Sequence, residues 1–400
     1  PSNRKHALFL LLPISILQAR DIHVGKDSDA PTIHHAIKLA APGDTIHLEP
    51  KVYRDYAGFY GKKGEAGKPI TLDGHGATLE GSDPIDPVKW REVLPGLFAN
   101  DDLMPGLHDA VIGRWFFLFD GKMQHMGRTS KGKQAPLKKP EDLQAGEWTF
   151  VKDPSREKPQ SKAIYGTFYL KLPAGQKLAD AKVFAPMRSA GVQMSGDNAH
   201  LVIKNLTATH PYNDGFNIHG DCLISFGQRL PATENIRAIE CGDDGISAHE
   251  TAEYRVDGFV SIGNSTGICD TVAAKTSYNR VFIADCIGFD LFFLDDGRYK
   301  LTNAVIYSKA QNPFTVTGRE DKHCELEIDN VLFRRLAEPR TALIAPSAVV
   351  RAKRLTMENI TFDARGSLQA EGAAEPVEIV KALGDAMVQE LTTRGYTLPK

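Results

Sequence analysis

Short apolar strands, each preceded by a polar or small turn residue, recur along the second half of the chain. Such a residue directly precedes an apolar stretch at Asn205, Gly258, Asp285, Asn303, Asn330 and Asn359. The steps between them are 53, 27, 18, 27 and 29 residues, and the first covers two repeats because residues 237–239 supply another strand between. A repeat of roughly 20–30 residues with short strands predicts a solenoid, whose coils bury their apolar sides against one another.

Asparagine suits the corners of such a coil. Its side chain tolerates the left-handed backbone conformation that a tight corner needs. Its amide can also hydrogen-bond to an asparagine at the same corner of the neighbouring coil. We therefore expect ladders of corner residues along the solenoid.

The N-terminal region predicts a short helix followed by strands. Ile33, Ile37 and Ala40 share one helical face, and Pro42-Gly43-Asp44 then ends the helix. Strand patterns follow at residues 45–49 and 69–73.

Residues 90–188 interrupt the repeat. Residues 115–121, 146–150 and 166–173 are rich in aromatic and β-branched residues, which predicts antiparallel strands and hairpins. A polar loop at 129–140 joins them and carries the one basic cluster of the chain. We interpret this cluster as a solvated loop: Lys131, Lys133, Lys138 and Lys139.

An amphipathic pattern at residues 375–391 predicts one helix near the C-terminus. Its apolar face comprises Val377, Val380, Leu383, Met387 and Leu391. We expect this helix either to cover the open end of the solenoid or to pack along its side, because an exposed sheet edge needs protection.

Composition narrows the possibilities only slightly. The net charge of −2 gives no general electrostatic reason for binding nucleic acid or an anionic membrane. Five cysteines, an odd number with no CxxC pair, argue against a disulfide scaffold or a structural zinc site. We expect buried thiols, with one disulfide left open.

The first residues resemble a secretory signal. Arg4 and Lys5 form a basic start, residues 7–17 are apolar apart from Ser15, and Ala19 suits a cleavage site. We predict a signal peptide at 1–20 and hence an extracellular, periplasmic or cell-surface protein; a buried N-terminal strand or helix is the alternative. The remaining divisions are a cap with the first coils (21–89), a β-rich insertion (90–188), the main coils (189–366) and a C-terminal helix (367–400).

Two near-copies of one segment are the strongest candidate for chemistry. Residues 213–219 read NDGFNIH and residues 243–249 read DDGISAH, 30 residues apart. Strand alternation directs His219 and His249 outward on one sheet, about 5 Å apart if the coils are adjacent. Asp214, Asp243 and Asp244 precede these strands at the turn, so we expect the acids to cluster beside the histidines.

The segment PTIHHAIKLAAPGDTIHLEPKVY at residues 31–53 resembles the opening of secreted right-handed parallel β-helix proteins of the pectate-lyase-like superfamily. The resemblance implies an all-β, right-handed parallel β-helix with an N-terminal capping helix. The stretch at 90–188 is similar to the β-rich insertion of β-helix glycosidases. In such enzymes the exposed sheet and its bordering loops carry the activity.

The runs NDGFN and GDDGIS resemble the two acidic motifs of polygalacturonase-type β-helix hydrolases. Carried over, Asp214, Asp243 and Asp244 become the catalytic acids. That family's downstream Gly-His-Gly and Arg-Ile-Lys are replaced here by Gly263-Asn264-Ser265 and by residues 297–300, GRYK.

A glycoside hydrolase is the leading hypothesis. Stacked carboxylates repel, so at least one should have a raised pKa, as a general acid requires. We expect the catalytic group to be the three acids with His219 and His249. The expected substrate contacts are Asn217, Tyr212, Asp270, Lys275 and Arg298. The partner would be a polysaccharide or oligosaccharide, with no cofactor, no nucleic acid and no membrane span, and the protein would be a monomer.

Four other interpretations stay open. A uronate polysaccharide lyase would use calcium held by aspartates, a base among His219, His249 and Lys275, and Tyr212 as proton donor. A non-catalytic surface β-helix would only bind glycans. The acids can also be ordinary turn residues of a repeat, or part of a histidine–aspartate site for a transition metal.

Overall fold

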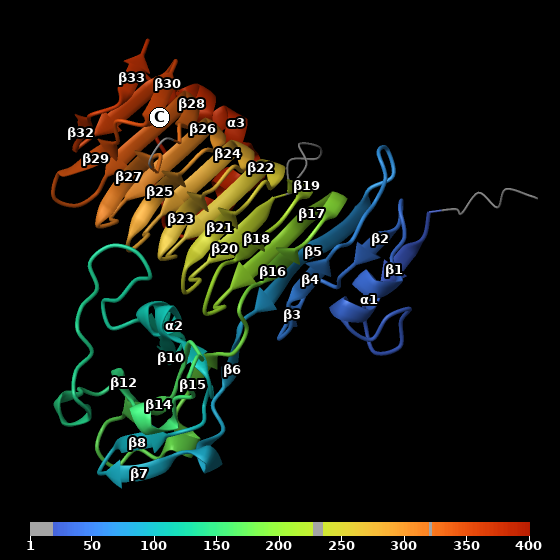
Figure 1. The fold of residues 1–400 in the computed structure, drawn as a ribbon. Coiled ribbons are helices and arrows are strands. Elements are labelled where there is room, and N and C mark those ends of the chain that lie inside the picture. Colours follow the sequence, from blue (N-terminus) through green and yellow to red (C-terminus); the bar gives the residue numbers. More distant parts are fainter. Residues whose placement is uncertain (1–18, 227–234, 320–321) are drawn as a thin grey trace, which may run out of the picture.

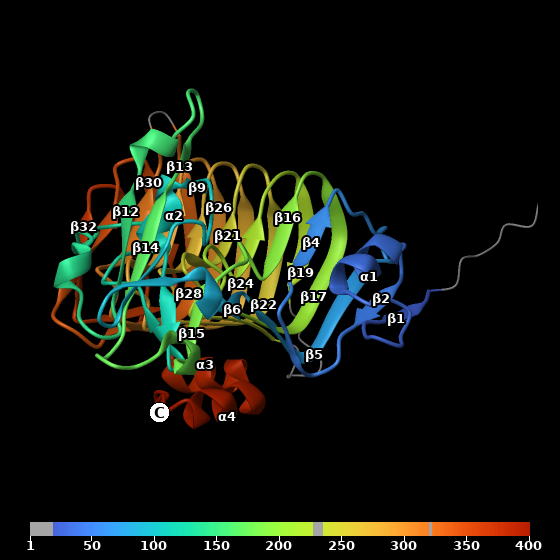
Figure 2. The same ribbon diagram turned by 90° about the horizontal axis from the view of Figure 1, so that it is seen from below.

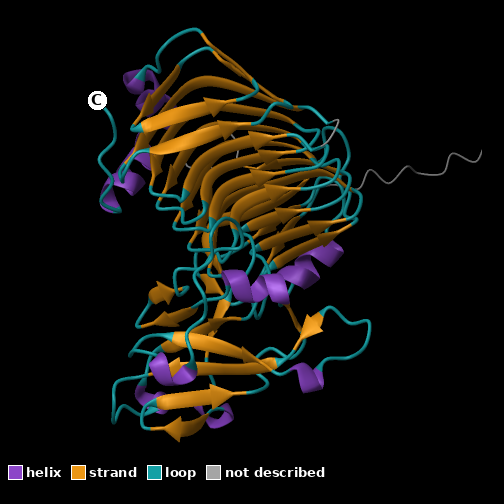
Figure 3. Ribbon diagram, turned by 60° about the vertical axis from the view of Figure 1, so that its left-hand side comes forward, coloured by secondary structure: helices purple, strands orange, loops and turns teal. Residues whose placement is uncertain are grey.

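The chain forms a parallel β-helix with a side lobe (Figures 1 and 3). The computed structural model describes residues 19–226, 235–319 and 322–400. Two long parallel sheets, of 14 and nine strands, run along the solenoid. The predicted all-β parallel solenoid is therefore confirmed.

The 14-stranded sheet forms one wall. Its strands are β1 (Asp21–His23), β2 (Thr45–His47), β3 (Val52–Tyr53), β5 (Ile70–Glu80), β17 (Asn198–Thr209), β19 (Cys222–Phe226), β20 (Ile236–Ile239), β22 (Glu253–Ile262), β24 (Lys275–Ala284), β26 (Arg298–Ser308), β28 (Cys324–Arg335), β30 (Ala348–Ala352), β31 (Leu355–Glu358) and β33 (Ser367–Ala370).

The nine-stranded sheet forms the facing wall. Its strands, in order, are β4 (Ala57–Tyr60), β16 (Val192–Ser195), β18 (Phe216–Ile218), β21 (Asp244–Ala248), β23 (Thr266–Asp270), β25 (Phe289–Leu294), β27 (Asn312–Thr317), β29 (Arg340–Ile344) and β32 (Ile360–Ala364). Alternate residues of both sheets point inward and stack coil upon coil; Phe216, Ile246 and Ile268 are fully buried in this core.

The corners follow the predicted ladder. Asn205, Asn303, Asn330 and Asn359 have φ values between 48° and 61°, in the left-handed region. The Asn330 Nδ2 donates to Asn303 Oδ1 at 3.0 Å, and Asn303 Nδ2 donates to Asn279 Oδ1 at 2.8 Å. These corners let long strands such as β26 bend without losing their pairing.

A short helix covers the N-terminal end, as predicted. Helix α1 (Ile33–Leu39) is capped by Thr32, whose hydroxyl accepts from the His35 backbone N–H. Its buried residues, Ile33, Ala36 and Ile37, join the solenoid core.

The insertion leaves the solenoid at β6 (Ser82–Pro84) and returns at β15 (Val183–Pro186), two strands that pair antiparallel. Between them lie η1 (Pro87–Lys89), β7 (Arg91–Leu94), β8 (Leu97–Asn100), β9 (Leu107–His108), α2 (Asp109–Arg114), β10 (Phe117–Phe119), β11 (Lys122–Gln124), η2 (Pro140–Asp142), β12 (Trp148–Lys152), η3 (Pro154–Arg156), β13 (Ala163–Ile164), β14 (Gly166–Lys171) and η4 (Leu178–Asp180). Antiparallel pairing and a separate aromatic core around Trp115, Trp148 and Phe168 make this lobe a unit of its own.

The C-terminal segment forms two helices where one was predicted. Helices α3 (Pro376–Leu383) and α4 (Asp385–Thr393) are separated by Gly384, whose φ of 81° ends the first helix. They pack along the side of the solenoid (Figure 2), against apolar residues of β22, β24, β26 and β28 such as Phe282 and Val305. Val377, assigned to the apolar face, is instead 63% exposed.

The five cysteines are free and buried, so the open disulfide is not formed. In the part of the chain that the structure describes, no helix is long and apolar enough to span a membrane. Most of the predicted signal peptide, residues 1–18, lies outside the described residues.

Candidate active site

The two near-copies lie on neighbouring coils, as the spacing predicts. Strand β18 pairs in parallel with β21, with Phe216 opposite Ile246, Asn217 opposite Ser247 and Ile218 opposite Ala248. Residues 30 positions apart in the two near-copies therefore lie side by side on adjacent strands.

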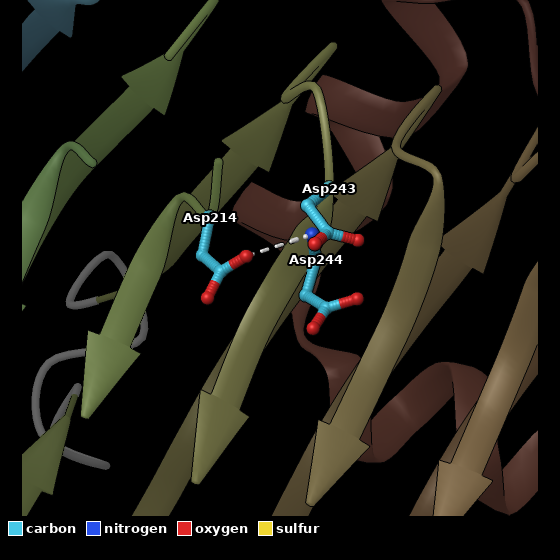
Figure 4. Close-up of side chains that lie close together, drawn as sticks. All are labelled: Asp214, Asp243 and Asp244. Atoms are coloured by element: carbon cyan, nitrogen blue, oxygen red, sulfur yellow. Dashed lines mark hydrogen bonds between the residues drawn. The ribbon is translucent and has the colours of Figure 1, made fainter. Parts of the chain in front are cut away.

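Three aspartates gather at the start of these strands (Figure 4). Asp214 precedes β18, and Asp243 and Asp244 stand at the start of β21. Each offers a carboxylate oxygen within 4.8 Å of the others. Asp214 accepts from the Asp244 backbone N–H at 3.1 Å and from the Ser247 hydroxyl at 2.6 Å. The exposed fractions are only 2%, 5% and 3% for Asp214, Asp243 and Asp244.

Two cations from the insertion reach this acid cluster. Arg114, the last residue of α2, donates from Nη1 to Asp243 Oδ2 at 2.7 Å. The Lys131 ammonium contacts Asp243 Oδ1 at 2.8 Å and also Asp244 Oδ1. The Ser130 hydroxyl donates to Asp243 Oδ1. The interpretation of Lys131 as part of a solvated loop is wrong, because its side chain is 20% exposed and bound to two acids.

Lys131 lies in residues 128–134, which we call the insertion loop. It is held on the nine-stranded sheet beyond the acids as well. Thr129 and Ser265 share a hydroxyl–hydroxyl hydrogen bond, and Lys133 exchanges two hydrogen bonds with Gln311, at 3.0 and 3.1 Å. The loop therefore covers the acid cluster.

The electrostatics separate one acid from the other two. Burial opposes ionisation of Asp243, but the charges of Lys131 and Arg114 outweigh it and hold its pKa well below the usual range. Burial and the neighbouring Asp243 charge raise the pKa of Asp214 to about 6. The same two causes raise the pKa of Asp244 well above its ordinary value. An ionised carboxylate thus stands beside two that retain protons more readily.

The histidines stack on the outer face of the same sheet, where the sequence places them. The His219 and His249 rings are stacked, 4.1 Å apart at their centroids and nearly parallel, with 2° between their planes. Burial, then the neighbouring His219, lowers the pKa of His249 to about 4, so His249 is neutral at ordinary pH. His219 Nδ1 lies 3.2 Å from a Glu250 carboxylate oxygen.

The predicted substrate-contact residues separate into four places. Asn217 adjoins the acids: its Nδ2 donates to Gln193 Oε1 at 3.2 Å, and its Oδ1 accepts from Ser247 at 3.4 Å. Tyr212 stacks on Trp115 at 6.0 Å and packs against the core of the insertion. Its ring therefore joins the lobe to the solenoid.

The other three do not reach the acid cluster. Asp270 is fully buried and accepts hydrogen bonds from Tyr254, Tyr278 and Thr276 inside the coil. Lys275 and Arg298 begin β24 and β26 on the 14-stranded sheet. Asp270 shares its register row with Ala248 and Phe293, whose side chains are buried in the core, so strand alternation itself directs Asp270 inward.

Sequence reasoning missed Arg114, Ser130 and Lys131. They lie more than 100 residues before the acids that they bind. The lysine cluster gave no signal that separates Lys131 from its neighbours, because only the path of the insertion brings it to the sheet.

The three carboxylates form a group that could hold a cation. Calcium prefers six to eight oxygen ligands, and here the Lys131 ammonium already stands among the acids. A metal ion would have to displace that side chain and recruit further oxygens.

No family model and no curated protein matches this chain. Among solved structures, it is similar to one described as a glycoside hydrolase, with a TM-score of 0.53, 10% identity, and coverage of 93% of this chain and 100% of the other. It is also similar to XylC in complex with xylose, with a TM-score of 0.50, 14% identity, and coverage of 84% and 69%. An alginate lyase from Paenibacillus sp. aligns with a TM-score of 0.38 and 11% identity, over 89% and 99% of the two chains, a resemblance too weak for comparing sites. At these identities the likeness establishes the parallel β-helix fold alone.

Proposed function

We propose that this protein is a carbohydrate-active enzyme that hydrolyses glycosidic bonds, with Asp214 and Asp244 as its acid/base pair. One observation carries the proposal: two carboxyl groups with raised pKa values stand on adjacent coils, beside a third carboxylate that stays ionised. Glycoside hydrolysis needs one carboxyl group that can protonate the leaving oxygen and one carboxylate that attacks or activates water.

Asp243 helps to raise the pKa values of Asp214 and Asp244 and stays ionised itself. Its charge raises the pKa of both Asp214 and Asp244. Two such groups titrate as a pair, so while the pair holds one proton, one carboxyl group can act as acid and the other carboxylate as base. Asp243 is a positioning residue, because its oxygens are engaged by Arg114, Lys131 and Ser130.

Substrate access requires the insertion loop to move. The pair is almost fully covered, and the Lys131 ammonium contacts Asp244. Gly127, directly before the loop, and Gly132 within it have φ values of 67° and 82°, a conformation that glycine adopts without strain. When Lys131 withdraws, a sugar can meet the carboxyl pair from the side of the histidines.

His219 and His249 then serve as substrate-positioning groups. A neutral His249 offers one donor and one acceptor to sugar hydroxyls. Asn217 adds an amide from the adjacent position of β18. The fold also supports a carbohydrate substrate, but only by analogy with its structural neighbours.

A uronate lyase is the second candidate. Lys131 and Arg114 supply two cations beside the acids, and such charges can neutralise a uronate carboxylate. Their pairing with Asp243 and Asp244 makes this use costly, since both acids would lose their partners. Export from the cell, and a monomeric state, remain predictions from the sequence.

A polysaccharide panel tests the proposal. Neutral and uronate polysaccharides would be incubated with the wild type and with Asp244→Asn. The hydrolase predicts new reducing ends, without the ultraviolet absorbance of an unsaturated uronate, and their loss in the variant. Products that carry that absorbance would establish the lyase instead, and no product from any glycan would overturn both.

A further inference from the structure

A cavity lies on the outer face of the nine-stranded sheet, over the strands that precede β18. It has a volume of about 340 Å³ and lies over β4 and β16, just before β18. Residues from two strands and the chain segment before β16 line it, among them Tyr56, Tyr60, Arg188, Gln193 and Ser195. Pockets of this size hold small ligands.

Two exposed tyrosines form the apolar part of this cavity. Tyr56 and Tyr60 are 37% and 55% exposed, so part of each ring is open to a ligand. Both rings lie against Gly58, because a Cβ added there would be 2.7 Å from Tyr60 Cε2 and 2.9 Å from Tyr56 Cε2. The glycine thus lets the two rings lie over the backbone of β4.

A polar row connects this position to the acid cluster. Gly58, Gln193, Asn217 and Ser247 are register partners on four successive strands. Along the row, Asn217 Nδ2 donates to Gln193 Oε1, and the Ser247 hydroxyl lies within hydrogen-bonding distance of both Asn217 Oδ1 and Asp214 Oδ2. Strands β4 and β18 are two steps apart, about 10 Å. An oligosaccharide of a few units spans that distance.

The charge of the cavity favours an uncharged ligand. Among the described residues that line the cavity, Arg188 carries a charge. Its Nη1 already donates to Asp83 Oδ1 at 2.9 Å. Burial and a hydrogen bond with Tyr56 raise the pKa of Tyr60 to about 12, so its phenol stays neutral at ordinary pH. What remains is a pair of ring faces with hydroxyl and amide groups at their edges.

We propose that Tyr56 and Tyr60 form a subsite that binds a neutral sugar unit of the substrate, on the β4 side of the bond that is cut. The inference rests on the proposed function and adds the substrate class and the direction in which the glycan lies. The apolar C–H face of the sugar packs on the tyrosine rings, whose apolar body and polar tip suit a partly wet site. Gln193 and Ser195 bond to its hydroxyls.

The test measures binding separately from cleavage. Xylohexaose, cellohexaose and an oligogalacturonate are titrated by calorimetry into Asp244→Asn and into Asp244→Asn with Tyr60→Ala or Tyr56→Ala. We expect a neutral hexasaccharide to bind, about tenfold more weakly after either tyrosine is removed. Tyr60→Phe, which keeps the ring, should bind within about twofold of the parent. Gly58→Ala, which displaces both rings, should bind as weakly as Tyr60→Ala.

The outcomes separate the two proposals. Equal affinity with and without the tyrosines, tighter binding of the oligogalacturonate, or no binding of either neutral hexasaccharide overturns the subsite. If Tyr60→Ala weakens binding while the wild type cleaves none of the glycans, the subsite stands and the hydrolase fails. In an active enzyme, Tyr60→Ala should raise KM for the hexasaccharide about tenfold and leave kcat on a single-sugar aryl glycoside unchanged.

Discussion

At the residue scale, one ammonium group controls the state of three buried acids. Lys131 contacts Asp243 and Asp244, and its charge partly offsets the rise that burial and Asp243 cause in the pKa of Asp214. Without Lys131, Arg114 would be the one cationic partner left, among the described residues, to carboxylates that lie within 4.8 Å of one another. Lys131 thus covers the site, and its charge limits how far the pKa values of Asp214 and Asp244 rise.

Replacing Lys131 tests this directly. Lys131→Met keeps the apolar stem and removes the charge, leaving buried carboxylates unpaired. We expect a loss of about 3 kcal/mol in the free energy of unfolding at pH 8. The loss should be smaller at pH 5, where the acids take up protons more readily. Urea unfolding at the two pH values measures this.

The matched control is Lys133→Met, two residues along the same loop. The hydrogen bonds of Lys133 to Gln311 use its backbone, so its side chain can be replaced without touching them. We expect a change below about 0.5 kcal/mol. Equal effects of the two substitutions would contradict the role given to Lys131.

Asp270 makes a separate prediction about pH. Burial raises its pKa to about 6 in the folded protein, against the ordinary 3.8. Between these values the folded chain keeps a proton that the unfolded chain releases, so this residue makes stability fall as pH rises from about 4 to about 6. The fall attributable to it is at most about 3 kcal/mol.

Asp270→Asn should remove that part of the pH dependence. The free energy of unfolding would be measured at pH 4 and pH 7 in the wild type and the variant. A smaller decrease in the variant is the expected result. An identical decrease would mean that Asp270 does not hold the proton.

At the element scale, local sequence predicts most of the architecture. Corner asparagines, strand alternation and the Thr32-capped helix each depend on neighbouring residues, so pattern alone places them. The C-terminal helix shows the limit of this reasoning. The apolar pattern runs on past Gly384 and therefore predicts one helix. The backbone of Gly384 has a φ of 81°, which ends α3, and α4 begins directly after it.

Helix α3 gives a prediction with an internal control. Leu383 is fully buried against the solenoid, whereas Val377 of the same helix is 63% exposed. Leu383→Ala should cost about 3 kcal/mol because it leaves a cavity, and Val377→Ala less than about 0.5 kcal/mol. Urea unfolding compares the two, and similar costs would mean that α3 does not dock through Leu383.

At the scale of the whole molecule, the site exists only where the lobe meets the solenoid. The coils supply the acids and histidines, which repeat spacing predicts because register fixes neighbours. The lobe supplies Arg114 and Lys131, which no local pattern predicts because their position depends on how a separate unit folds back. Asp270 failed for a different reason: strand alternation places it in the inward row beside Ala248, where it accepts hydrogen bonds from Tyr254 and Tyr278 of the facing wall.

The most direct test of the acid/base pair is the release of reducing sugar from a polysaccharide that the wild type cleaves. Asp244→Asn and Asp214→Asn would be compared with Asp290→Asn, which replaces another fully buried aspartate whose pKa burial raises to about 7. We predict a loss of at least about 100-fold in kcat for the first two. Asp290→Asn should stay within about threefold of the wild type. Near wild-type turnover in a folded Asp244→Asn or Asp214→Asn variant would contradict the account.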